Sequence, residues 1–353
     1  MKKLGNIIMR LHKKTQITSP KNSASWEFKF MTVHDSVLLN EVLESLNPDA
    51  NQDFIDGTLG GGGHAEEILK RILPNGRLLG LDWDKDAVER VQVRLKKYDN
   101  NVVLINDSYI RIKKHVYENG FSSFDGILLD LGLSLDQLKA SGRGFTFQQD
   151  EPLDMRYSVD NELTAAEIVN SYSQTSLETL FREYGEEGQA GAIAKAIVTK
   201  RKEETIDRTV QLVDLIKEVK GMNPWTRTNP ATKVFQALRI AVNQEFDNIQ
   251  SVITDAIELL NPGGRLAIIT FHSLEDRIVK EYFKMESTSC ICPKELPQCV
   301  CLHKARVKLV NRKPITPSDK ELQDNRRSRS AKLRVVEKLD VMKLQNVTNN
   351  YKK

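Results

Sequence analysis

From residue 53 onward, short apolar runs alternate along the chain with stretches of helical periodicity. The apolar runs are residues 53–56, 77–81, 102–106 and 124–129. The helical stretches between them are residues 65–73, 86–97 and 109–119. Runs this apolar are typical of strands that are covered on both faces, and strands separated by helices belong to parallel sheets with crossover helices. The pattern predicts an α/β fold.

The alternation is interrupted between the fourth strand and a fifth one at residues 264–270. Helical patterns with polar faces fill this gap, at residues 176–184, 190–202, 209–219 and 231–260. The last of them carries one apolar stripe at helical spacing, formed by Phe235, Leu238, Val242, Phe246 and Ile249. We therefore predict a helical domain inserted into the sheet domain.

The chain ends in a helical pattern and two short strand patterns. After the fifth strand come a helix at residues 274–285 and apolar runs at residues 306–310 and 332–336. We expect the two runs to pair antiparallel at the edge of the sheet.

Charge is distributed unevenly over the 353 residues. Residues 1–31 hold seven basic residues and one acidic residue, and residues 302–353 hold fifteen and five, so the middle is acidic. Basic ends indicate a polyanionic partner, although solvated tails are an alternative. The first 31 residues are interpreted as a basic arm, with an organellar presequence or a later start at Met31 as alternatives. No apolar run is long enough to span a membrane, and we expect a cytoplasmic protein.

A glycine-rich loop, DGTLGGGGH at residues 56–64, follows the first strand. Glycines at such a turn let the backbone approach a ligand closely. Asp82 ends the second strand twenty residues after Gly62, at the spacing of an acid that accepts hydrogen bonds from ribose hydroxyls. Asp56 favours S-adenosylmethionine over a dinucleotide, because that cofactor carries cationic groups and no phosphate. A tight turn without a ligand is the alternative.

Asp130 ends the fourth strand, where open α/β sheets place their reacting groups. It is the first candidate for chemistry, and a simple turn residue is the alternative.

Several ordered motifs together resemble one family. They are GTLGGGGH at 57–64, GILLDLG at 126–132, RGF at 143–145, PLDMR at 152–156, FQALRI at 235–240, FHSLEDR at 271–277 and RSRSAKLR at 327–334. This set is similar to that of the bacterial ribosomal RNA small subunit methyltransferase H family, also called the MraW type. The resemblance extends over residues 33–338.

The resemblance implies an α/β class I S-adenosylmethionine-dependent methyltransferase, with a Rossmann-like sheet and an inserted helical domain. It assigns residues 32–137 and 248–338 to the methyltransferase domain, 138–247 to an inserted substrate-recognition domain and 339–353 to a C-terminal tail. The implied reaction is methylation of the exocyclic N4 of a cytidine in the decoding region of 16S rRNA, cytosine 1402 in conventional rRNA numbering. The implied partner is 16S rRNA in the small ribosomal subunit, with no membrane and no obligate protein partner.

The resemblance also implies site residues. Cofactor contacts fall on these positions: Gly62, Gly63, His64, Asp82, Tyr109, Asp130 and Gln137. Asp82 is expected at the ribose, Tyr109 at the adenine and Asp130 in the catalytic position. The chain departs from the family pattern at Leu135 and around Gly188, which keeps a non-catalytic ribosome-assembly or RNA-binding factor as an alternative function. A nicotinamide oxidoreductase is disfavoured, because no motif supplies a hydride-accepting site.

Residues after the fifth strand offer two interpretations. His272 and Glu275 lie at the cofactor edge and are expected to shape the target pocket. Ser273 and Asp276 match a helix capping box, which is a structural role.

Two further groups are candidates for the RNA side of the site. Asp154 and Arg156 lie in an irregular segment that we expect to form a loop over the pocket. Phe145, Phe147 and Trp225 either stack on RNA bases or belong to a core.

All four cysteines lie in two C-x-C pairs separated by six residues, Cys290 and Cys292, then Cys299 and Cys301. Such clustering is typical of a structural zinc site, although the spacing is not the usual C-x-x-C. A reduced surface loop is the alternative, and the metal content stays open at this point.

Overall fold

The computed structural model describes residues 36–131, 141–146, 148–158, 161–221, 229–293, 295–296 and 298–340. Structural statements below concern these residues. Gln137, Phe147, Trp225, Leu135 and the arm at residues 1–31 lie outside them.

The predicted sheet is present and has seven strands in the order β3-β2-β1-β4-β5-β7-β6. The strands are β1 (Phe54–Asp56), β2 (Leu78–Asp82), β3 (Val102–Asn106), β4 (Phe124–Asp130), β5 (Leu260–Thr270), β6 (Val307–Leu309) and β7 (Lys332–Lys338). Strands β1 to β5 are parallel, whereas β7 is antiparallel to both β5 and β6. The antiparallel edge pair is confirmed. β5 begins earlier than predicted, at Leu260, with a register shift opposite Asp125.

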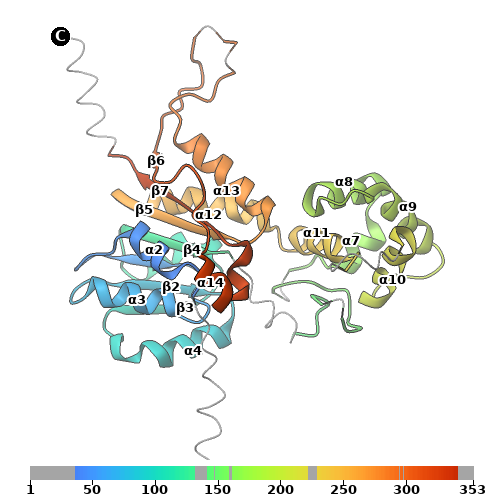
Figure 1. The fold of residues 1–353 in the computed structure, drawn as a ribbon, viewed down its shortest axis with the longest axis horizontal. Coiled ribbons are helices and arrows are strands. Elements are labelled where there is room, and N and C mark those ends of the chain that lie inside the picture. The colour runs from blue at the N-terminus through green and yellow to red at the C-terminus, as the bar shows by residue number, and fades with distance from the viewer. Residues whose placement is uncertain are drawn as a thin grey trace, which may run out of the picture. The chain divides into compact units, whose positions relative to one another are not determined.

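Helices cover both faces of the sheet (Figure 1). One face packs against α5 (Ile112–Glu118), α12 (Glu245–Leu259) and α13 (Ser273–Glu286). The other packs against α2 (Leu39–Leu46), α3 (Gly63–Ile72) and α4 (Lys85–Leu95). Successive strand residues alternate between the two cores, because side chains in a strand point to opposite faces. In β4, for example, Ile127 and Leu129 face the first core and Leu128 faces the second. This burial on both sides explains the continuous apolar runs.

A third hydrophobic core lies among the helices between β4 and α12. They are α7 (Ala165–Ser171), α8 (Gln174–Gly185), α9 (Ala190–Lys200), α10 (Thr209–Lys220) and α11 (Thr232–Val242), which gather in one cluster in Figure 1. Phe181, Ile193 and Leu212 are fully buried in this core. The predicted limits of the inserted domain, residues 138–247, stay a prediction. A short helix, α14 (Asp319–Asp324), precedes β7.

The helix predicted at residues 231–260 is wrong, because the chain breaks between α11 and α12. Gln244 adopts a left-handed conformation with φ 50°. Asn243 fixes the break: its side-chain amide donates to the carbonyls of Met155 and Arg239 at 2.8 and 2.9 Å, and its Oδ1 accepts from the amide of Tyr157 at 2.8 Å. The break splits the predicted apolar stripe, whose first half enters the helical core and whose second half packs on the sheet.

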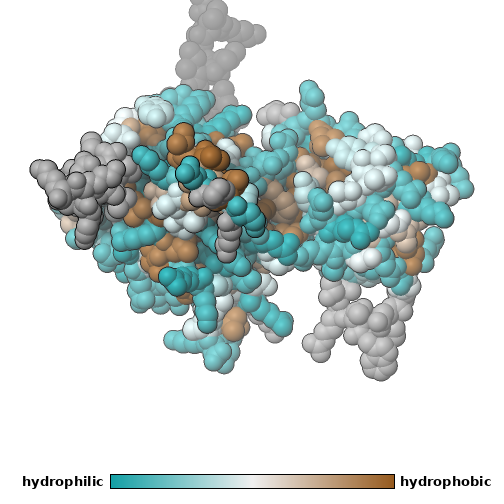
Figure 2. All heavy atoms as spheres, turned by 90° about the horizontal axis from the view of Figure 1, so that it is seen from above, coloured by the Kyte–Doolittle hydropathy of each residue, from teal (hydrophilic) through white to brown (hydrophobic). Residues whose placement is uncertain are grey.

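None of the described helices combines the length and the apolar character needed to cross a membrane. The face drawn in Figure 2 is mostly hydrophilic, with apolar side chains in small groups.

We expect Asn243→Ala to lower the free energy of unfolding by about 2–4 kcal/mol, because it leaves the buried carbonyl of Met155 and the half-buried amide of Tyr157 without their side-chain partner. Chemical denaturation measures this change. Gln250→Ala, at an exposed position of α12, is the matched control and should change it by less than about 0.5 kcal/mol. Equal stabilities of the two variants would contradict the role assigned to Asn243.

Candidate functional site

The glycine-rich loop joins β1 to α3 and is tied to both neighbouring strands. The amide of Gly57 donates to the carbonyl of Leu128 in β4 at 2.9 Å, and the amide of Leu59 donates to that of Leu81 in β2 at 3.0 Å. Gly62 caps α3 with φ 75°, and a Cβ there would lie 2.9 Å from a methyl group of Val91. Only glycine meets both constraints without strain. The loop is held with its backbone at the carboxyl edge of the sheet.

Three carboxylates meet at this edge, at the ends of β1, β2 and β4. Asp82 accepts hydrogen bonds from the amides of Gly60 at 2.8 Å and Asp84 at 2.9 Å, so it fastens the glycine-rich loop to β2. The amide of Asp130 donates to the Thr58 hydroxyl at 2.6 Å, which holds the end of β4 against the same loop. The structure thus brings Asp82 and Asp130 to the same edge as Asp56, and their predicted roles stay predictions.

Asp56 is the most perturbed of the three. Its Oδ1 accepts from the amide of Thr58 at 3.1 Å, while its buried Oδ2 has no hydrogen-bond partner among the described residues. Burial, with the nearby charges of Asp130 and Asp82, raises the pKa of Asp56 to about 7. A cation entering this edge would favour the ionised form of Asp56.

His64 and Tyr109 flank the carboxylates. The His64 ring is buried in the first turn of α3, with its Nε2 3.0 Å from the carbonyl oxygen of Val37, and burial lowers its pKa to about 4. The neutral ring therefore holds the segment before α2. Tyr109 follows β3 and is half-buried; desolvation and the charges of Glu245 and Glu275 raise its pKa. Their predicted cofactor contacts stay predictions.

A second group of charged and polar side chains lies at the start of α12, around Glu245. Arg239 donates to both carboxylate oxygens of Glu245, at 2.8 and 3.0 Å, and the Tyr157 hydroxyl donates to the same carboxylate at 2.7 Å. Side-chain atoms of Glu245, His272 and Glu275 lie within 4.8 Å of one another. The charge of Glu245 is already balanced by Arg239, and Glu275 caps α13. Both carboxylates therefore have structural roles.

The predicted Ser273–Asp276 capping box is wrong. The helix α13 begins one residue earlier than that pattern requires, so His272 is the cap and its Nδ1 accepts from the amide of Glu275 at 3.3 Å. The Glu275 carboxylate accepts in return from the amides of Phe271 and His272. Asp276 instead forms a buried ion pair with Arg334, whose Nε lies 2.6 Å from Asp276 Oδ1.

The segment at the start of the insertion places an aromatic side chain, that of Tyr157, against the end of β2. Arg156 and Asp154 form a two-point ion pair at 2.8 and 2.9 Å, which shapes this segment locally. The next residue, Tyr157, stacks on Trp83 at the end of β2 with ring centroids 5.4 Å apart. Phe145 stacks on Tyr157 at 5.7 Å, so it packs within the protein. Sequence reasoning missed Trp83 and Tyr157, although each directly follows a motif residue.

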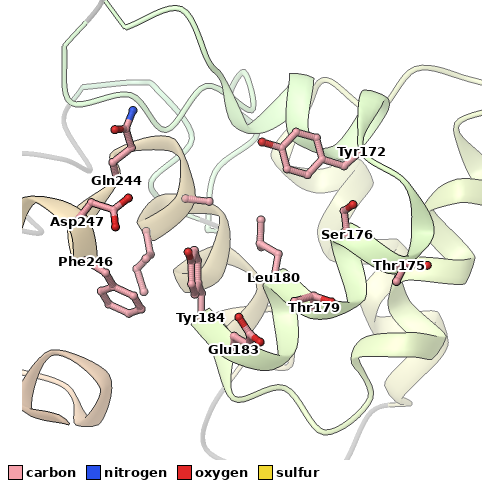
Figure 3. Close-up of a pocket in the computed structure, with 12 residues that line it drawn as sticks. Tyr172, Thr175, Ser176, Thr179, Leu180, Glu183, Tyr184, Gln244, Phe246 and Asp247 are labelled. Atoms are coloured by element: carbon pink, nitrogen blue, oxygen red, sulfur yellow. The ribbon is translucent and has the colours of Figure 1, made fainter. Parts of the chain in front are cut away.

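A pocket of about 440 Å³ lies between α8 and the break that separates α11 from α12 (Figure 3). Tyr172, Tyr184 and Phe246 give it aromatic walls, with Ser176 and Asp247 as polar lining residues. Phe246 packs edge-on against Tyr184 at 5.0 Å and lies 6.3 Å from the His272 ring. The pocket therefore adjoins the end of β5.

Comparison with known proteins identifies the family. A family model described as the MraW methylase family matches residues 31–339. The chain belongs to the MraW methylase family. It is 46% identical over 87% of its length to a protein of Carboxydothermus hydrogenoformans named ribosomal RNA small subunit methyltransferase H, covering 98% of that protein. It is 45% identical over 87% of its length to a protein of the same name from Clostridioides difficile, covering 99% of it.

Solved structures resemble the chain more distantly. A putative rRNA methylase from Clostridium thermocellum has a TM-score of 0.39 at 13% identity, over 86% of this chain and 99% of that one. A putative methyltransferase from Streptococcus mutans in complex with SAH has a TM-score of 0.39 at 14% identity, over 86% and 99%. The class I methyltransferase fold follows from the family and from the observed strand order.

The MraW methylases use S-adenosylmethionine, and the residues at the carboxyl edge fit this cofactor. It supplies, when bound, an electrophilic methyl group on a cationic sulfonium. Three carboxylates, with the unpaired Oδ2 of Asp56 among them, are complementary to its positive charges. This negative charge favours the cofactor over a ligand that carries phosphates.

We expect the affinity of this methylase for S-adenosylmethionine to fall below pH 7, by up to about tenfold per pH unit, because Asp56 must lose its proton to attract a cation. Isothermal titration calorimetry between about pH 5.5 and 8.5 measures it. Asp56→Asn should bind more weakly at high pH and lose this component of the pH dependence. The same slope in both proteins would show that another group is responsible.

Proposed function

We propose that this methylase transfers a methyl group from S-adenosylmethionine to the exocyclic N4 of a cytidine in the decoding region of 16S rRNA, with the small ribosomal subunit as substrate, in the cytoplasm. The match over nearly the whole length to relatives named ribosomal RNA small subunit methyltransferase H carries this proposal. The carboxylate at the end of β4 and the aromatic pocket beside β5 support it.

In this proposal the carboxyl edge holds the cofactor. Gly62, Gly63 and His64 bind it along the first turn of α3, Asp82 accepts from its ribose hydroxyls and Tyr109 lies on its adenine side. Asp82 already accepts two backbone hydrogen bonds, which hold its carboxylate in one orientation and leave further lone pairs for a ligand. Asp130 and Gln137 complete the set, Gln137 from outside the described residues.

Asp130 is the proposed catalytic residue. The lone pair of a cytosine N4 is delocalised into the ring, so methylation requires the amino group to be aligned and its proton to be accepted. A carboxylate at the end of β4 accepts a hydrogen bond from that amino group and directs the nitrogen toward the methyl carbon. The bond from the Asp130 amide to Thr58 keeps this strand end in place, and positioning of this kind supplies much of the rate.

The aromatic pocket is the proposed RNA surface. A base must leave its stack to reach the edge of the sheet, and enzymes that act on bases hold the displaced nucleotides by stacking and hydrogen bonds. Tyr184 and Phe246 supply aromatic faces next to His272, so RNA bound there would lie beside the reacting edge.

The deciding experiment is transfer of labelled methyl from S-adenosylmethionine to small ribosomal subunits from a strain that lacks this gene, followed by nucleoside mass spectrometry. N4-methylcytidine at one site is the expected product. Label in a different nucleoside would contradict the proposed target atom. Absence of label despite normal cofactor binding would favour a non-catalytic assembly factor.

Asp130→Asn should fold normally and lose turnover by about a hundredfold or more, because the amide cannot accept the proton. Single-turnover methyl transfer measures the chemical step directly. Asp214→Asn, an exposed carboxylate on α10, is the control and should keep its activity. Near-normal turnover of Asp130→Asn would remove Asp130 from the proposed chemistry.

Tyr184→Ala should raise the KM for the ribosomal substrate about tenfold, since one stacked base contributes about 1–3 kcal/mol, and should leave the affinity for S-adenosylmethionine unchanged. Tyr117→Ala is the matched control, because Tyr117 is 69% exposed on α5 and lies outside the pocket. Equal KM values for the two variants would show that the RNA does not use this pocket.

A further inference from the structure

The four cysteines lie in the loop of residues 287–306, between α13 and β6, which we call the cysteine loop. Helix α13 starts at the carboxyl edge of the sheet and runs back across the sheet to its other edge. Strand β6 runs in the same direction as β5, since both are antiparallel to β7, and so begins at that other edge. The cysteine loop therefore leaves the sheet at the edge opposite the cofactor site. Figure 1 shows it extending beyond α13 and β6.

The four thiols converge on one point. All four Sγ atoms lie within 4.8 Å of one another. Cys290 and Cys299 are 3.4 Å apart, Cys299 and Cys301 3.6 Å, and Cys290 and Cys301 3.9 Å. Four sulfurs bound tetrahedrally at about 2.3 Å from one zinc ion are separated by about 3.8 Å. The observed spacing is that of ligands around a single metal ion.

Two backbone amides point at the sulfurs in a reciprocal arrangement. The amide of Ile291, inside the first C-x-C pair, donates to Cys301 Sγ at 3.5 Å. The amide of Val300, inside the second pair, donates to Cys292 Sγ at 3.4 Å. Each pair thus supplies a donor to the last sulfur of the other pair. Such donors orient metal ligands and stabilise the thiolate form that binds a metal.

Among its described residues, the cysteine loop has no hydrophobic core to hold this arrangement. Its apolar side chains face solvent: Ile291 is 51% exposed, Val300 71% and Leu302 89%. The base of the loop is fixed by the Arg306 amide, which donates to the Glu286 carbonyl at 2.8 Å, and by His303, whose Nε2 lies 3.0 Å from the Met285 carbonyl oxygen. A long loop without secondary structure or buried apolar side chains requires another cross-link to keep one conformation.

We propose that Cys290, Cys292, Cys299 and Cys301 bind one Zn²⁺ ion as a tetrahedral thiolate site that folds the cysteine loop. Thiolates in this geometry select zinc among the common divalent ions, and four protein ligands leave no open position for substrate. The site is structural, and it is independent of the methyl-transfer function. His303 is not a ligand, because its ring is used at the base of the loop.

The first test is the metal content of the full chain, purified under reducing conditions with zinc in the growth medium and dialysed. We expect one zinc per chain by mass spectrometry of the metals, with four thiols that react with a thiol reagent only after zinc is removed. Zinc replaced by Co²⁺ should give the intense visible absorption of a tetrahedral thiolate site. A zinc-free chain with four freely reactive thiols, a chain loaded with iron, or two disulfides found by alkylation without reduction would each overturn the proposal.

Variants test the ligand set. Cys290→Ser with Cys299→Ser should lose the zinc and expose the cysteine loop to proteolysis, while cofactor binding shows that the sheet domain is still folded. Ser289→Ala and His303→Ala are controls within the same loop and should each retain one zinc. Retention of zinc by the double cysteine variant would mean adventitious binding elsewhere, and loss of zinc from His303→Ala would contradict the four-cysteine ligand set.

Discussion

The parallel pairing of β1 with β4 is the constraint on which the rest of the site depends. Because β4 lies beside β1 rather than beside β3, the strand order reverses at this point, which is where open α/β sheets bind their ligands. The glycine-rich loop leaves β1 at this point and is bonded to β4 through Gly57 and Thr58. A shift in this pairing would separate Asp56 from Asp130 and remove the binding edge.

The same pairing concentrates negative charge. Bringing Asp56, Asp82 and Asp130 to one edge is unfavourable, and burial together with the two neighbouring charges raises the pKa of Asp56. A cationic cofactor offsets it, so binding and ionisation are coupled. Farther from the strands the charge is balanced internally, by Arg239 against Glu245. Among the described residues, Asp56 Oδ2 therefore has no partner of its own, whereas the Glu245 carboxylate is already neutralised by Arg239.

Local patterns in the sequence predict the elements well where burial is symmetric. β1 to β4 lie within a residue of their predicted bounds, because strands buried on both faces read as uninterrupted apolar runs. The predictions were wrong where a side chain far away in the sequence decides the outcome. The apolar helical pattern continues on both sides of Asn243. The helix nevertheless breaks there, because the Asn243 side chain forms hydrogen bonds with Met155 and Tyr157. Asp276 pairs with Arg334 in β7, and His272 rather than Ser273 caps α13.

The sequence by itself determined the α/β fold, the glycine-rich loop, the acids at the strand ends and the clustering of the cysteines, because each depends on residues that are neighbours along the chain. Only the tertiary structure decided which of these groups meet. The stack of Tyr157 on Trp83, the pocket beside Phe246 and the convergence of four sulfurs join residues that periodicity does not relate. Such contacts depend on how packed elements cross in space, and local propensity does not carry that information.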